Sequence, residues 1–160
     1  GYNPLISLIH SRKTDIAVFL IDSGANVNDS NNDGETPLHL AFRDVNLAKK
    51  LLESGADVNA RDKNGKTPLH EASEWGYSEF VKLLVGNGAD INAQDNNGAT
   101  PLHCAANDYA NNANQFDFVM LLIDLGSSLT IKDCNGLTPY DIATNKRNES
   151  ISKLLKCTCK

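Results

Sequence analysis

Hydrophobic residues recur along the chain in short stretches that have helical spacing and end at glycines. In "SEFVKLLVGNG", Phe80, Leu83 and Leu84 fall at positions i, i+3 and i+4, which predicts an amphipathic helix. Gly88 follows the last apolar turn, where a glycine commonly ends a helix by adopting a positive φ. The stretch therefore predicts a helix that stops just before Gly88.

A shorter helix is predicted immediately before this one. Thr67 is a favourable N-cap, and Pro68 suits the first helical position, where its missing N–H has no cost. The apolar pattern continues through Leu69 to about Trp75, and Gly76 ends it. The segment "ADINAQDNNG" beyond the second helix is rich in turn formers, so we expect it to project as a hairpin-like loop.

This pattern of two helices and a loop is repeated along the chain. The phrase that begins the first helix occurs four times, as "GETPLHLA" at 34–41, "GKTPLHEA" at 65–72, "GATPLHCA" at 98–105 and "GLTPYDIA" at 136–143. The intervals between the threonines are 31, 33 and 38 residues, and Asn3-Pro4-Leu5, 33 residues before Thr36, is a degenerate first copy. Two short helices cannot bury their apolar faces by themselves, so the copies are expected to stack.

The repeated TPLH phrase on a period near 33 residues resembles the ankyrin repeat family, and the resemblance covers nearly the whole chain. It implies an all-α ankyrin-repeat solenoid of about five stacked helix-turn-helix units with projecting β-turn or hairpin loops. The chain would form a single ankyrin repeat domain, with units at approximately 1–30, 31–61, 62–94, 95–132 and 133–160. The resemblance also implies that the TPLH histidine ties its own turn to neighbouring backbone.

The two ends differ from the middle. In "NESISKLLK", Ile151, Leu154 and Leu155 share one face, so the last helix is expected to seal the stack and turn its polar side to water. In the first unit Ile6 replaces the histidine. We therefore expect the first unit to be the least stable.

Charge and hydropathy narrow the function classes. The formal charge of −5 argues against nucleic acid or an anionic membrane as the main partner, because both require a basic face. No apolar run approaches the length of about 20 residues that spans a bilayer, and the N-terminal stretch lacks the layout of a signal peptide. The expectation is a cytoplasmic, monomeric domain.

Two motifs suggest a ligand but match it incompletely. "ARDKNGKT" at 60–67 is a relaxed phosphate-binding loop, but the slot of Lys66 holds Glu35, Ala99 and Leu137 in the sister units, which indicates a surface lysine. "DSNNDGET" matches the first half of a calcium-binding loop, but its twelfth position is Leu40 where a bidentate glutamate is needed. Neither nucleotide nor calcium binding is predicted.

The histidines, cysteines and hydroxyls do not assemble into a recognisable centre either. The TPLH histidines stand one unit apart, about 8–10 Å, whereas zinc–nitrogen bonds are near 2.0–2.1 Å. The cysteines are Cys104, Cys134 and the pair Cys157 and Cys159, which have no metal-ligand spacing. We predict no cofactor, no metal and no catalytic activity.

The main hypothesis is a protein-interaction module, and the alternative is a structural spacer or scaffold array within a larger multidomain protein. In the ankyrin family the variable slots are the turn tips and the inward face of the first helices, which form a concave groove. The candidate contacts in those slots and in the insertion of the fourth unit are Glu35, Arg43, Asp44, Lys63, Lys66, Glu74, Trp75, Asn107, Asp108 and Tyr109. A tryptophan flanked by charges has the composition of an interface anchor, and its alternative interpretation is packing over the next unit.

Two units depart from the period, and two asparagines fit a further family feature. The second unit is two residues short between its helices, and the fourth is five residues long there, at "NDYANNANQFDF". An insertion of this kind serves binding or is a tolerated loop. Asn59 and Asn92, each eight residues after a leucine, resemble family targets of asparaginyl hydroxylation.

Overall fold

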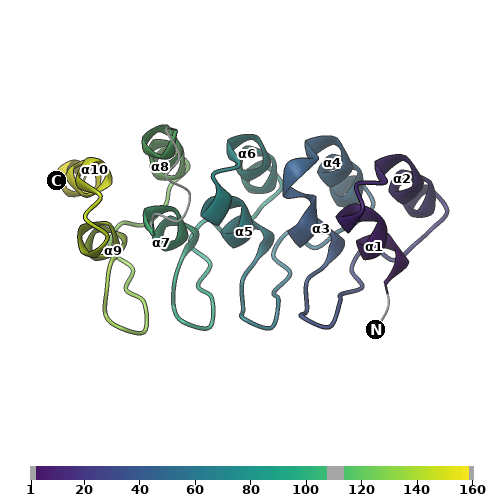
Figure 1. Ribbon diagram of the computed structural model, residues 1–160, viewed down its shortest axis with the longest axis horizontal. Helices are drawn as coiled ribbons and strands as arrows, with labels where there is room; N and C mark the ends of the chain where they lie inside the picture. The colour runs from purple at the N-terminus through teal and green to yellow at the C-terminus, as the bar shows by residue number, and fades with distance from the viewer. Residues whose placement is uncertain (1–2, 108–113, 159–160) are drawn as a thin grey trace.

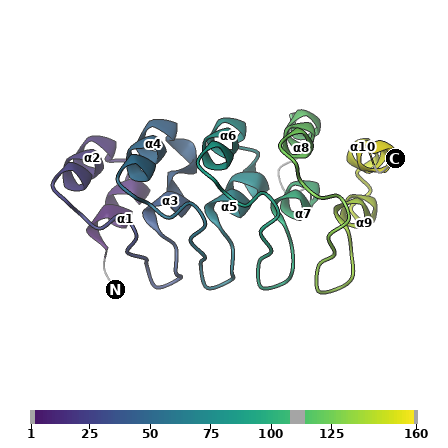
Figure 2. The ribbon, with the colours of Figure 1, turned by 180° about the vertical axis from the view of Figure 1, so that it is seen from behind.

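The computed structural model of the protein describes residues 3–107 and 114–158, which form a row of paired helices (Figure 1). The inner helices, which lie nearer the projecting loops, are α1 (Pro4–His10), α3 (Pro37–Leu40), α5 (Pro68–Trp75), α7 (Pro101–Ala106) and α9 (Pro139–Asn145). The outer helices are α2 (Thr14–Asp22), α4 (Val45–Glu53), α6 (Ser78–Gly86), α8 (Gln115–Asp124) and α10 (Glu149–Thr158). The same two rows are visible from behind (Figure 2).

The inner helices of the three central units begin with the same set of hydrogen bonds. In the third unit the backbone N–H of Thr67 donates to Nδ1 of His70 over 3.1 Å, and Nε2 of His70 bonds the carbonyl of Ala99 over 3.0 Å. Because a backbone N–H can only donate, Nδ1 accepts and Nε2 carries the hydrogen. His39 and His103 repeat both contacts, to Lys66 and Leu137 respectively. The expected role of the TPLH histidine is confirmed.

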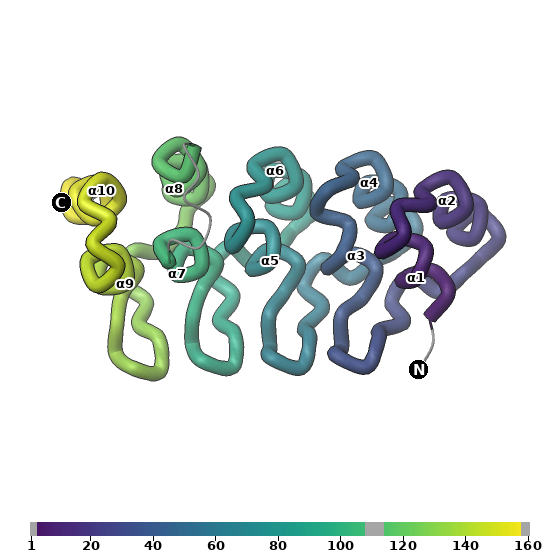
Figure 3. The backbone as a smooth tube through the Cα atoms, viewed as in Figure 1, coloured from purple at the N-terminus to yellow at the C-terminus, as the bar shows by residue number. Residues whose placement is uncertain are grey.

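The projecting loops are tight turns that lie side by side along one edge of the stack (Figure 3). In the third unit the N–H of Asp62 bonds the carbonyl of Lys66, and Gly65 closes the tip by bonding back to Asp62. Single backbone bonds join successive tips, such as the one from Lys63 N–H to the Asp33 carbonyl over 2.9 Å. Among the described residues these bonds form hairpin-like turns without β-strands.

The core lies between the two helix rows and runs the length of the stack. The first four inner helices each contribute the leucine that follows their starting proline, whereas α9 has the partly buried Tyr140 there. The outer helices contribute pairs one turn apart. Fully or almost fully buried members are Leu38, Leu69, Leu102, Leu47, Leu51, Phe80, Leu84, Phe118, Leu122, Ile151 and Leu155. The burial of Ile151 and Leu155 on α10 confirms that the last helix covers the end of the apolar core.

The turn between the paired helices varies most. In the third unit Gly76 ends α5 with φ 73°, and Arg12 and Arg147 take the same left-handed conformation at the matching positions of the first and fifth units. The second unit lacks this turn. Its inner helix tightens into a 3-10 turn, Ala41–Arg43, and Asp44 then caps α4 directly. The insertion of the fourth unit lies largely at 108–113, outside the described residues.

The first unit replaces the missing histidine with a different cap. The side-chain oxygen of Asn3 accepts the N–H groups of Leu5 and Ile6, over 2.9 and 3.2 Å, and its amide donates to the Asp29 carbonyl. Both capping bonds are local, whereas the histidines of later units also bond the following unit. The first unit is therefore attached to the second by fewer bonds of the repeating type.

Candidate functional site: the groove face

The groove face comprises the turn tips and two varying positions on each inner helix. These positions lie three and six residues after the helix-starting proline, one helical turn apart, so they share a face. The first position holds Ser7, Leu40, Glu71, Cys104 and Ile142, and the second holds His10, Arg43, Glu74, Asn107 and Asn145. The face therefore changes from cationic at the second unit to acidic at the third.

A central cluster of Lys66, Glu71 and Glu74 occupies the middle of this face. The Lys66 ammonium lies 2.6 Å from Glu74 and 3.3 Å from Glu71, and all three side chains are between one fifth and three tenths exposed. Burial opposes the charge on Lys66, but the bond to Glu74 and the two carboxylate charges outweigh it and raise the pKa of the ammonium. Burial raises the pKa of Glu71, although Lys66 opposes that shift. In this network one cation is shared by two carboxylates, which leaves a formal charge of −1.

A cavity of 340 Å³ lies beside this cluster, towards the fourth and fifth units. Lys66, Glu74, His103, Cys104 and Asn107 are among its lining residues. Burial raises the pKa of the Cys104 thiol to about 12, and Lys66 opposes the shift only in part. The thiol therefore stays protonated at neutral pH, which makes it a poor nucleophile.

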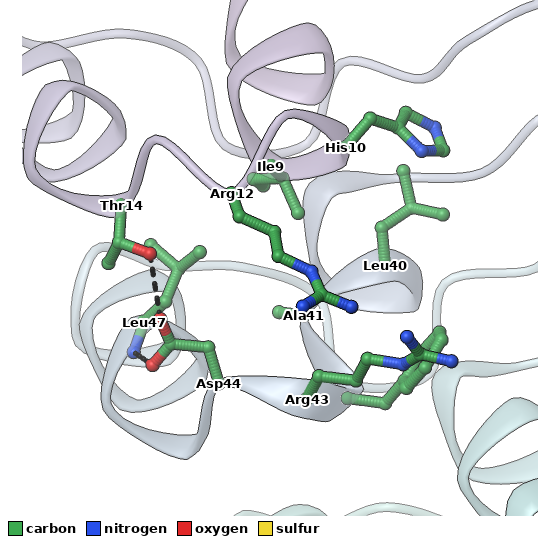
Figure 4. A pocket seen from close by; sticks show the side chains of 10 residues that line it. Ile9, His10, Arg12, Thr14, Leu40, Ala41, Arg43, Asp44 and Leu47 are labelled. Carbon is green, nitrogen blue, oxygen red and sulfur yellow. Dashed lines mark hydrogen bonds between the residues drawn. The ribbon is translucent and has the colours of Figure 1, made fainter.

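A second cavity, of 480 Å³, opens between the first and second units, and we call it the junction pocket (Figure 4). Its lining residues are Ile9, His10, Arg12, Thr14, Leu40, Ala41, Phe42, Arg43, Asp44 and Leu47. The guanidinium of Arg43 stacks 5.5 Å from the centre of the Phe42 ring. Asp44 accepts hydrogen bonds from Thr14 Oγ1 and from the backbone N–H of Leu47, over 2.9 and 3.0 Å.

The structure places the predicted contact residues in different settings. Lys66, predicted to be a surface lysine, turns its ammonium back to α5 and pairs with Glu74. Trp75 is 49 % exposed, and Lys63 is exposed at a turn tip. Glu35 is half-buried and accepts a bond from Asn31. The remaining placements are Arg43 and Asp44 in the junction pocket, Asn107 in the central cavity, and Asp108 and Tyr109 outside the described residues.

Sequence reasoning missed Glu71, Cys104, His10 and Arg12. Glu71 and Cys104 lie three residues after the helix-starting proline. This position varies between copies as much as the position six residues after the proline, from which candidate contacts were taken. His10 shares its slot with Arg43 and Glu74, so comparison of the copies could have found it. Arg12 gave a weaker signal, because the second unit has no residue at the matching place.

The histidines of the frame are neutral, structural groups. Burial lowers the pKa of His39, His70 and His103, although the bond from each ring to a backbone carbonyl opposes the shift. Within residues 3–107 and 114–158, no group of three or more His, Cys, Asp or Glu side chains is placed to hold a metal ion. No helix in the described part of the chain is long and apolar enough to cross a membrane.

These features define a helical repeat solenoid whose variable residues gather on one face. The family model described as "Ankyrin repeats (3 copies)" matches the chain at residues 1–62, 41–133 and 87–160. The chain therefore belongs to the ankyrin repeat family, whose domains are generally protein-binding modules. No curated protein matches the chain.

Proposed function

We propose that this domain is a non-catalytic module that binds a partner protein through the groove face. The observation that carries the proposal is Trp75, which is 49 % exposed at the end of the central inner helix and lies one turn after Glu71 of the groove face. Large aromatic side chains are enriched among interface residues that contribute most to affinity, and they act best near the middle of a contact surface. Trp75 lies in the third of five units, so flanking contacts on both sides can exclude water from it.

We further propose that the module acts as a monomer in the cytoplasm. Cys104, Cys134 and Cys157 are free thiols, as is usual in a reducing compartment. The formal charge of −5 supports a protein partner over nucleic acid or an anionic membrane. The groove contacts we propose are Trp75 and Glu74 at the centre, Arg43 and Asn107 on either side, and Lys63 and Glu35 at the tips, with Asp44, Lys66, Asp108 and Tyr109 completing the set.

The alternative is a structural array that packs against another part of a larger protein. One observation favours it: Ile16 and Phe19, three residues apart on outer helix α2, are 49 % and 67 % exposed. Adjacent exposed apolar side chains often mark a contact surface. In that case the contact would lie on outer helix α2 of the first unit and not on the groove face.

Affinity capture with the domain as bait tests the proposal. A Trp75→Ala bait and a Phe19→Ser bait are compared with the unchanged domain, and the dissociation constant of each captured protein is then measured. Trp75→Ala should weaken groove binding by about 2 kcal/mol, or roughly thirtyfold, whereas Lys63→Ala at an exposed tip should change affinity less than about threefold.

Melting curves of each bait separate lost binding from lost folding. Because Trp75 is half exposed, its replacement should shift the melting temperature by only a few degrees. The proposal fails if a folded Trp75→Ala bait retains its partners while Phe19→Ser loses them. That result would support the structural array.

A further inference from the structure

The junction pocket exists because the second unit is short. In the third unit a left-handed turn at Gly76 leads from the inner to the outer helix. The second unit goes directly from the 3-10 turn Ala41–Arg43 to Asp44 and α4, so it has no residues that match Ser11 and Arg12 of the first unit. The space next to Arg12 is left open, with Ala41 beneath the Arg12 side chain (Figure 4).

Two guanidinium groups reach this space from different units. Arg12 extends from the inter-helix turn of the first unit, and Arg43 lies at the end of the 3-10 turn of the second (Figure 4). In the described part of the chain, neither arginine forms an ion pair with a carboxylate. Both are exposed to solvent. The pocket therefore holds two cations without a counter-ion from the protein.

The one acidic residue of the pocket is already engaged. Both carboxylate oxygens of Asp44 accept hydrogen bonds, one from the hydroxyl of Thr14 and the other from the N–H of Leu47. These bonds hold the carboxylate at the start of α4, where it caps the helix. The Asp44 side chain thus serves as a cap and does not bridge the arginines.

We propose that the junction pocket binds a glutamate or aspartate side chain from an acidic segment of a partner protein, with an aliphatic residue beside it. Guanidinium groups bind carboxylates through paired, charge-assisted hydrogen bonds, and two arginines from different elements can hold one carboxylate or two successive ones. Ile9, Leu40 and Ala41 provide apolar surface for the neighbouring aliphatic side chain. A volume of 480 Å³ lies within the usual range of ligand sites, about 300–1,000 Å³, and accommodates such a pair.

The charge of the rest of the molecule makes this recognition local. The chain carries a formal charge of −5, so an acidic segment is disfavoured over most of the surface. In the central cluster the ammonium of Lys66 is already paired with Glu71 and Glu74. An acidic segment therefore finds two arginines without ion pairs to the described residues at the junction pocket, whereas the lysine of the central cluster is already engaged.

Arg12 adopts an unfavourable conformation there, with φ 55° where the third unit uses a glycine. This conformation does not by itself mark a site, because Arg147 has φ 58° at the matching turn of the last unit. Arg12, however, stands beside a second arginine in the junction pocket. Arg147 is therefore the matched control for any change at Arg12.

Nuclear magnetic resonance of the arginine side chains tests the proposal directly. The probe is a synthetic peptide with blocked ends, acetyl-Glu-Glu-Leu-Leu-amide, titrated into the whole domain while the Nε–H signals of Arg12 and Arg43 are followed. Both signals should shift and saturate, and those of Arg61 and Arg147 should not. The peptide in which glutamine replaces both glutamates should bind at least about tenfold more weakly.

Variants show whether the two arginines act together. Arg12→Gly and Arg43→Gln should each reduce the affinity for the glutamate peptide about tenfold, while Arg147→Gly leaves it unchanged. Both changes keep a residue that suits the local backbone, and melting curves confirm that the variants fold. Equal binding of the glutamine peptide, equal loss in Arg147→Gly, or no shift with millimolar peptide overturns the proposal.

A phosphoserine peptide and inorganic phosphate complete the experiment. Binding of either more than about tenfold tighter than the glutamate peptide would identify the pocket as a phosphate site and overturn the assignment to a carboxylate. The inference rests on the proposed function only in taking the acidic segment from a partner protein. Because the peptide titration does not involve Trp75, its failure leaves the capture experiment valid, and failure of capture leaves the titration valid.

Discussion

The central cluster and the junction pocket lie one unit apart, but the cation is paired with carboxylates in the first and, within the described part of the chain, the cations are unpaired in the second. In the central cluster the Lys66 ammonium is shared between Glu71 and Glu74, and all three side chains are largely withdrawn from water. In the junction pocket Arg12 and Arg43 are exposed and have no ion pair among the described residues. The cation of the central cluster is already bound by protein carboxylates, whereas the guanidinium groups of the junction pocket are bound by none of the described ones.

The difference follows from unit length and from the residues of the repeating frame. The third unit has the full turn at Gly76 and a buried His70 that bonds the next unit. The second unit is short, and the first has Ile6 in place of the histidine, so the surface between them stays open. A small change of length in a repeat can therefore leave an open pocket at the junction between two units.

Acidification should produce the largest change in this comparison. Burial lowers the pKa of His39, His70 and His103 below the ordinary value of 6.5, whereas the unfolded chain keeps that value. The unfolded state then binds more protons, so stability is complete above about pH 7.5 and is lost as the pH falls below about 6.5. Each extra proton bound by the unfolded state lowers the free energy of unfolding by up to about 1.4 kcal/mol per pH unit. Three histidines together lower it by up to about 4 kcal/mol per pH unit.

Urea titrations at a series of pH values measure this loss, and hydrogen exchange locates it. The second, third and fourth units each carry one buried histidine and the first carries none, so acid should reduce the protection of the central helices towards that of α1. At neutral pH, α1 and α2 should be less protected than α5 and α6, because the first unit has a neighbouring unit on one side only in the described stack and the third has one on each side. The pKa of Glu71 is raised above its ordinary value of 4.5, so the folded state binds this proton first as the pH falls. Protonation of Glu71 therefore adds stability, at a lower pH than the loss caused by the histidines. A free energy of unfolding that increases as the pH is lowered from 7 to about 5.5 would contradict the assignment of neutral, buried histidines.

Removal of a single frame histidine should have the next largest effect. His70→Ala leaves the Thr67 N–H and the Ala99 carbonyl without their side-chain partner and opens a cavity at a fully buried position. We expect a loss of about 3 kcal/mol in the free energy of unfolding, measured by urea denaturation. His10→Ala, an exposed position in the junction pocket, should stay within about 0.5 kcal/mol. Similar losses in both variants would mean that the central junction is no more tightly bonded than the first.

The central cluster should be sensitive to loss of its cation. Lys66→Met leaves Glu71 and Glu74 as neighbouring like charges, and we expect a loss of about 1–2 kcal/mol because the side chains keep some contact with water. Adding Glu71→Gln and Glu74→Gln to the same chain should restore most of the stability. Arg43→Met should cost about 0.5 kcal/mol, since Arg43 only stacks on Phe42. An equal cost for Lys66→Met and Arg43→Met would remove the distinction between the two regions.

Much of the fold could be predicted because the frame residues act locally. Thr67 and Pro68 start a helix, Gly76 and Gly88 end helices, and each effect depends on a few neighbouring residues, so repetition in the chain makes it visible. The burial of Leu69 and Phe80 follows from helical spacing. Such local rules applied along the chain predict the pairing of helices in the central units.

The candidate site was only partly predictable, because it depends on the path of long side chains and on the two residues that the second unit lacks. The slot of Lys66 is at the turn tip, but the direction of its ammonium is set by Glu71 and Glu74 on the following helix. The two residues missing from the second unit were visible in the sequence. Their consequence, an open space beside Arg12, depends on the packing of two units and could not be derived from either unit separately.

The smallest expected effect concerns Arg12 and separates stability from recognition. Its φ of 55° is costly for a residue with a Cβ, by about 1 kcal/mol, and a glycine removes that strain but adds freedom to the unfolded chain. Arg12→Gly should therefore raise the free energy of unfolding by about 0.5 kcal/mol, and Arg147→Gly should behave alike in thermal melts. A loss of 1 kcal/mol or more in Arg12→Gly would show that the stem of Arg12 packs on Ala41 and that the arginine is there for structure. A small gain, together with loss of the glutamate peptide in the same variant, would show that the strained arginine serves recognition at the expense of stability.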